Sequence, residues 1–110
     1  MIEALWSVEF ISDMDVMGAG VVVLETEKIL GGDSQYFYVC KYEVNNQELE
    51  AEIEVTHYSG EANSIFGPED KFSVKITGEI KKEIMMGQGH RVDNPQRKLG
   101  VRLTRRAELP

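Results

Sequence analysis

A strict alternation of glutamate and apolar residues over residues 47–58 constrains the fold of this chain more than any other feature. Apolar side chains occupy every second position and glutamates the positions between: Leu49, Ala51, Ile53 and Val55 against Glu48, Glu50, Glu52 and Glu54. Successive side chains of a β-strand point to opposite faces, so this pattern predicts a strand with one buried face and one face of carboxylates.

The two-residue period recurs along the chain, which predicts an all-β protein. Further strands are expected at about 4–11, 21–24, 29–30, 35–44, 71–79, 83–87 and 99–104. Turns are expected at Asp13–Met17, Glu25–Lys28, Gly31–Ser34 and Asn45–Asn46, a turn or a single helical turn at Asn63–Pro68, and a loop at His90–Lys98. About eight strands joined by short turns fit an up-and-down barrel or a two-sheet sandwich. Because the hairpins are sequential, we predict an antiparallel up-and-down barrel forming a single domain, residues 1–110.

Charge is divided unevenly along this acidic chain, whose formal net charge is −7. Residues 1–70 hold 15 of the 19 acids and only two lysines, a net charge of −13, whereas residues 71–110 carry a net charge of +6. The overall balance argues against direct nucleic-acid binding, which ordinarily uses a basic face. Two interpretations stay open: neighbouring strands neutralise each other, or a charged surface faces a partner.

The glutamate row is the first candidate site, because four carboxylates on one strand face repel each other and need an offset. Lys71 and Lys75, on the outer face of the next expected strand, would pair with two of them. The other two would meet Arg102 or Arg106 across a homodimer, or a basic protein partner. The predicted partner-binding residues are therefore Glu48, Glu50, Glu52 and Glu54. Within one chain, the C-terminal arginines are expected to form salt bridges with the acidic half.

Inward-facing aromatic residues form the second candidate site. They either fill the barrel or line a cavity for a small apolar ligand: Trp6, Phe10, Tyr36, Tyr38 and Tyr42. Cys40 shares their face and is expected to be a small buried hydrophobe.

Other site chemistry has little support in the sequence. His57, His90 and Cys40 are the residues best suited to bind zinc, and they form no paired motif, so neither a metal nor another cofactor is expected. We find no catalytic constellation, and predict that the protein is not an enzyme. One cysteine fits a reducing compartment. Because we find neither a signal sequence nor an apolar stretch of about 20 residues, we expect a cytoplasmic protein that does not enter the membrane.

Four stretches resemble a known family in their order and spacing. They are Leu5–Phe10, Gly18–Val23, Gly31–Ser34 with Tyr36 and Tyr38, and Ser64–Gly67, and together they resemble the GrlR-like family of bacterial type III secretion negative regulators. The resemblance implies a small, eight-stranded, lipocalin-like barrel that is often dimeric. It also implies regulation by binding, since the best-known member represses by binding a helix-turn-helix transcriptional activator. That member uses a run of consecutive Glu and Asp, whose nearest counterpart here is the glutamate row.

Two functional hypotheses follow. The leading one is a non-enzymatic regulatory module that binds a basic protein partner through its acidic outer face. The alternative is a barrel that binds a small apolar ligand in its interior.

Overall fold

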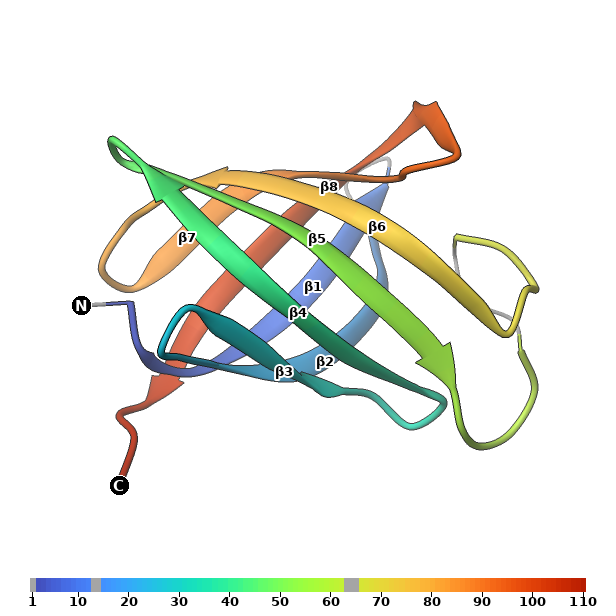
Figure 1. The fold of residues 1–110 in the computed structure, drawn as a ribbon, viewed down its shortest axis with the longest axis horizontal. Helices are drawn as coiled ribbons and strands as arrows, with labels where there is room; N and C mark the ends of the chain where they lie inside the picture. The colour runs from blue at the N-terminus through green and yellow to red at the C-terminus, as the bar shows by residue number, and fades with distance from the viewer. Residues whose placement is uncertain (1, 13–14, 63–65) are drawn as a thin grey trace.

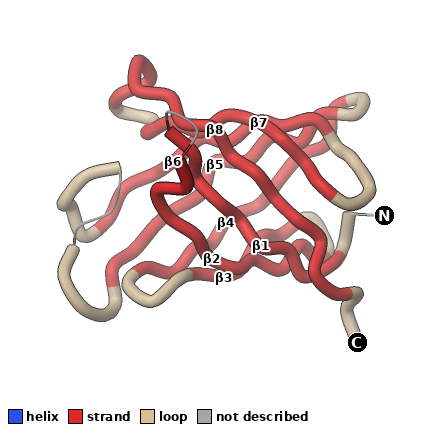
Figure 2. Tube along the Cα trace, turned by 180° about the vertical axis from the view of Figure 1, so that it is seen from behind, coloured by secondary structure: helices blue, strands red, loops and turns tan. Residues whose placement is uncertain are grey.

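The computed structural model describes residues 2–12, 15–62 and 66–110, which form eight β-strands and no helix (Figures 1 and 2). The strands are β1 (Ala4–Ser12), β2 (Asp15–Glu25), β3 (Lys28–Gly32), β4 (Tyr36–Asn45), β5 (Glu48–His57), β6 (Lys71–Glu79), β7 (Ile84–Arg91) and β8 (Asn94–Ala107). Each strand pairs antiparallel with the next, and β1 also pairs with β8, so the sheet closes into a barrel. The predicted antiparallel up-and-down barrel is confirmed.

The hydrophobic core fills the inside of this barrel because apolar residues alternate inward along each strand. On β5 all four apolar residues of the alternating segment are buried, with exposed fractions of 3–7%. Trp6 of β1 is fully buried, and its indole nitrogen donates a hydrogen bond to the carbonyl of Ile2 at 2.8 Å. That bond satisfies a donor that would otherwise be costly to bury.

The two ends of the barrel differ, and we name them by what they carry (Figure 1). The terminal end, at the left of Figure 1, carries both chain termini and the β2–β3, β4–β5 and β6–β7 connections. The pocket end, at the right, carries the β3–β4 turn, the long segment between β5 and β6, and the β7–β8 turn.

Of two predicted hairpin turns that lie at the terminal end, the one at Glu25–Lys28 is confirmed, and the one predicted at Asn45–Asn46 lies one residue later, at Asn46–Gln47. Thr26 and Glu27 join β2 to β3 with φ angles of 52° and 64°. Two-residue hairpins of the commonest type need positive φ at both positions, because their twist then matches that of the strands. Asn46 between β4 and β5 has φ 59°, a region that asparagine tolerates better than most residues.

The predicted turn over Gly31–Ser34 is wrong in its first half. Gly31 and Gly32 end β3, and the turn begins at Asp33. These glycines are required by close packing, since a Cβ on Gly31 would lie only 2.1 Å from the carbonyl oxygen of Val21 on β2. The glycine pair therefore marks the close approach of two strands and not a turn of the chain.

Two other predicted connections are shorter than expected. Asp15–Met17 belong to β2, because a β-bulge in β2 at Met17, between the pairs Phe10–Gly18 and Ile11–Val16, shifts the register and lets the β1–β2 pairing continue to Asp15. The predicted His90–Lys98 loop is instead a tight hairpin, in which β7 extends to Arg91 and β8 begins at Asn94. Residues 13–14 of the first predicted turn, and 63–65 of the predicted turn at 63–68, lie outside the described residues.

Candidate functional site

The glutamate row lies on the outer face of β5, as predicted, and its two halves have different neighbours. Glu54 forms an ion pair of 2.8 Å with Lys71 of β6, which confirms one predicted pair. Glu52 lies directly opposite Lys75 in the register, although the two form no ion pair. This half of the row is partly neutralised.

The other half faces carboxylates. Glu50 lies directly opposite Glu43 of β4, and Glu48 lies directly opposite Glu79 of β6. Glu79 is also paired with Lys81 at 3.0 Å, and Glu50 accepts a hydrogen bond of 3.3 Å from the Asn45 side chain. We name this group the acidic corner: Glu43, Glu48, Glu50 and Glu79. Like charges directly across an antiparallel pair are destabilising in general, so the acidic corner is not expected to add to the stability of the fold.

Sequence reasoning missed Glu43 and Glu79 as members of this site. A signal for Glu43 was present, because a two-residue turn at Asn46–Gln47 pairs Asn45 with Glu48 and, counting back along both strands, Glu43 with Glu50. Glu79 needed the β5–β6 register, which is set across the long segment between these strands and is not fixed by a short turn.

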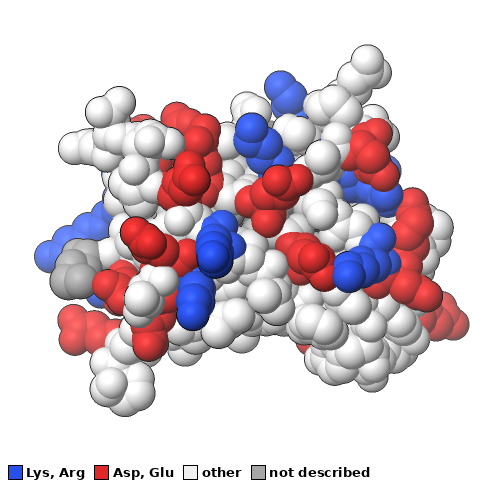
Figure 3. All heavy atoms as spheres, viewed as in Figure 1, with Lys and Arg blue, Asp and Glu red and all other residues white. Residues whose placement is uncertain are grey.

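An apolar patch lies next to the glutamate row on the outer surface. Its members come from β2, β3 and β4 and are 42–51% exposed: Val21, Leu30, Phe37 and Val39. Leu30 lies opposite Val39, and Val39 lies opposite Glu54, so the patch continues directly into the glutamate row. Figure 3 shows red carboxylates, blue bases and wide white areas side by side on one face of the barrel. Apolar and charged side chains therefore adjoin each other on this outer surface.

The predicted aromatic residues all point inward, but the structure divides them into two groups. Phe10, Tyr36 and Tyr38 come together at the pocket end, where they line a pocket of about 250 Å³. Trp6 and Tyr42 pack in the core and do not line that pocket. The apolar space deeper in the barrel measures about 30 Å³, which is room for water-sized molecules and not for a fatty acid.

A polar corner closes one side of the pocket at the pocket end. The Asp33 carboxylate accepts hydrogen bonds from the backbone nitrogens of Gln35 and Tyr36, both at 2.8 Å, and from the hydroxyl of Tyr38. Burial and the bond to Asp33 raise the pKa of Tyr38, so this hydroxyl stays protonated and acts as the donor. Three donors thereby fix the orientation of the carboxylate.

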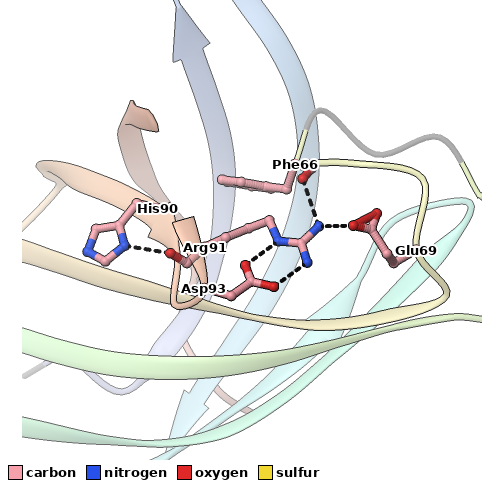
Figure 4. Close-up of polar contacts among 5 residues, drawn as sticks. All are labelled: Phe66, Glu69, His90, Arg91 and Asp93. Carbon is pink, nitrogen blue, oxygen red and sulfur yellow. Dashed lines mark hydrogen bonds and ion pairs between the residues drawn. The ribbon is translucent and has the colours of Figure 1, made fainter. Parts of the chain in front are cut away.

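Another part of the pocket wall is formed by Phe66, which lies in the segment between β5 and β6. Its ring packs edge-on against Phe10 with ring centroids 5.2 Å apart. Figure 4 shows that Arg91 donates hydrogen bonds to the Phe66 carbonyl at 3.1 Å, to Glu69 at 2.7 Å and to both oxygens of Asp93. Arg91 also lies over the ring of Phe72 at 5.0 Å. One side chain from β7 therefore holds this wall in place.

The residues considered for zinc are scattered. Cys40 points into the barrel, where burial raises the pKa of its thiol to about 12. His57 bonds the Gly60 carbonyl at 2.8 Å, and His90 bonds the Arg91 carbonyl at 2.9 Å. Within residues 2–12, 15–62 and 66–110, no three His, Cys, Asp or Glu side chains are grouped to bind a metal.

The C-terminal arginines bind residues of β1. Arg102 pairs with Glu9 at 2.8 Å, which confirms the predicted salt bridge to the acidic half. Arg106 donates to the Ser7 hydroxyl at 2.8 Å, and Arg105 lies over the Trp6 ring at 5.7 Å. Arg102 is therefore occupied within its own chain and is a poor candidate for pairing with the glutamate row of a second copy.

Comparison with known proteins assigns no family: no family model matches the chain, and no curated sequence matches it. The described part of the chain also has no helix long and apolar enough to cross a membrane.

Proposed function

We propose that this protein is a non-enzymatic regulatory module of the cytoplasm that binds a basic protein partner on the outside of its barrel. The binding surface consists of the acidic corner and the adjoining glutamates of β5, with the apolar patch beside them. The observation that carries the proposal is that glutamates lie directly opposite each other in the strand register, Glu43 opposite Glu50 and Glu48 opposite Glu79.

These pairs of opposed glutamates favour a basic partner for an electrostatic reason. Two carboxylates held opposite each other repel, and a cation placed between them relieves that repulsion. Glu43, Glu48 and Glu79 are exposed and Glu50 is partly buried, so a partner can reach all four. A complementary basic surface would also be attracted over some distance, which speeds association.

The apolar patch supplies binding affinity that charge pairs alone do not supply. Exposed charge pairs contribute little affinity, whereas burying apolar side chains such as Leu30 and Phe37 contributes most of it. The partner we propose therefore presents lysines or arginines beside apolar side chains. An amphipathic basic helix, such as those of helix-turn-helix proteins, has this composition, and the resemblance to GrlR-like regulators supports the same class of partner.

Charge reversal gives a test in which lost binding is not explained by a damaged fold. Glu50→Lys places a lysine opposite Glu43 and turns a repulsive pair into an attractive one, so we expect thermal stability to hold or to rise by a few tenths of a kcal/mol. Capture of the purified partner, first identified by pull-down from the host, should fall at least tenfold for the double variant Glu48→Lys, Glu50→Lys.

The matched control reverses two exposed acids outside the corner, Glu61→Lys and Glu108→Lys, and changes net charge equally. Equal loss in both double variants would show that only total charge matters, and undiminished capture would reject this surface. Sedimentation of the free protein addresses the homodimer: if it is dimeric and Leu30→Asp makes it monomeric, the apolar patch holds a second copy and the proposed partner surface is wrong.

A further inference from the structure

We infer that the pocket at the pocket end binds a small organic cation, namely an amine or quaternary ammonium compound with one apolar or aromatic substituent. This site is separate from the proposed protein-binding surface, and its ligand differs from the apolar molecule considered for the barrel interior.

Aromatic side chains form much of the pocket wall. Phe10 comes from β1, Tyr36 and Tyr38 from β4, and Phe66 from the segment between β5 and β6, and all four line the same space. The electron-rich faces of aromatic rings attract cations, and quaternary ammonium groups are commonly recognised by sites with several rings. A purely apolar ligand would also contact these rings, so the choice depends on the polar corner.

Asp33 provides the charge that selects a cation. Asp33 lines the pocket, and the groups that bond its carboxylate in the described part of the chain, two backbone nitrogens and the Tyr38 hydroxyl, are neutral. No lysine, arginine or histidine is among the described residues that line the pocket. An ammonium group in this space would therefore meet an unneutralised negative charge, whereas the carboxylate of a fatty acid would be repelled.

The backbone beside the pocket leaves room for the hydrogen bond between Tyr38 and Asp33. A Cβ on Gly20 of β2 would lie 3.2 Å from the Tyr38 hydroxyl and 2.8 Å from the Gly32 carbonyl oxygen, so glycine leaves the space through which Tyr38 reaches Asp33. The pocket volume of about 250 Å³ is below the usual range for drug-sized ligands, which suits a single ring with a short amine chain.

Three probes with the same ring and similar length test the charge preference: phenethylamine, 2-phenylethanol and phenylacetate. We expect chemical shift titration of the wild-type protein to show that the amine binds at least about tenfold tighter than the alcohol, and that phenylacetate binds more weakly still. The shifts should move at Asp33–Tyr38 and Phe66. Equal binding of amine and alcohol, shifts confined to other regions, or no binding up to about 10 mM amine would overturn the inference.

Asp33→Asn then assigns the preference to one group. Asparagine keeps an oxygen that accepts the two backbone hydrogen bonds, but it removes the charge. The tenfold preference for the amine should disappear, while Glu25→Gln, an equal charge change at the terminal end, should leave it intact. Persistence of the preference in a folded Asp33→Asn protein would refute the role of Asp33. If that variant does not fold, the wild-type probe series still decides between the ligand classes.

Discussion

Replacing Arg91 by methionine should destabilise the whole barrel through loss of one anchored segment. Methionine keeps an unbranched apolar side chain against Phe72 but removes the guanidinium that holds the Phe66 carbonyl and Glu69. The Arg91 side chain is only 13% exposed, so water does not easily replace these contacts. The variant therefore isolates the contribution of the charged group.

The expected magnitude follows from the separate contacts. The hydrogen bond to the Phe66 carbonyl contributes about 1 kcal/mol, and the cation–π contact with Phe72 about another 1 kcal/mol because it is largely shielded from water. Glu69 is half exposed and Asp93 more exposed still, and ion pairs with such exposed carboxylates add little. The free energy of unfolding should therefore fall by about 2 kcal/mol, which lowers Tm by about 10 °C in a domain of this size.

Urea denaturation followed by tryptophan fluorescence measures this change, since Trp6 is the only tryptophan and is fully buried. Lys98→Met on β8 is the matched control, because Lys98 is exposed and forms no ion pair in the described part of the chain. If Arg91→Met destabilises the protein no more than Lys98→Met does, the anchoring argument fails.

Two further predictions concern titratable groups. Because burial raises the pKa of Cys40 to about 12, a disulfide reagent at about pH 8 should react with the folded protein at least about tenfold more slowly than with the protein in urea, and equal rates would contradict the burial of this thiol. The hydrogen bond from Arg102 lowers the pKa of Glu9, so its stabilising effect is present above the ordinary glutamate pKa and is lost as pH falls through the lowered value. Melting curves should therefore show that the wild type loses more stability between about pH 6 and about pH 3 than Arg102→Gln does; parallel losses would exclude this linkage.

Strand identity was predictable because burial on one face of a sheet imposes a period of two. The segment at 71–79 follows this rule along its length, and its predicted and observed bounds agree. The strands that were predicted too short are those where small or polar residues break the pattern, such as Gln88 and Gly89 of β7. At such positions the backbone still pairs with the neighbouring strands, but few side chains indicate which face of the strand is buried.

The candidate sites were less predictable, because they depend on register and on contacts far apart in sequence. The acidic corner joins Glu48 to Glu79, and the pocket wall joins Phe66 to Phe10, in each case through segments separated by dozens of residues. Periodicity shows which face a side chain occupies, but not its neighbour on the next strand. The aromatic residues were therefore correctly placed inside, while their division between the core and the pocket was not foreseen.

Closure of the barrel limits how this protein can recognise a partner. A closed sheet has no free edge strand, so a partner cannot add a strand by backbone hydrogen bonding, and recognition falls to the outer side chains and the barrel ends. On the outer surface, the carboxylates of Glu43 and Glu50 weaken the sheet that displays them. Substitutions chosen only for stability would therefore remove the acidic corner first. This conflict between stability and surface charge supports our proposal that the acidic corner binds a partner.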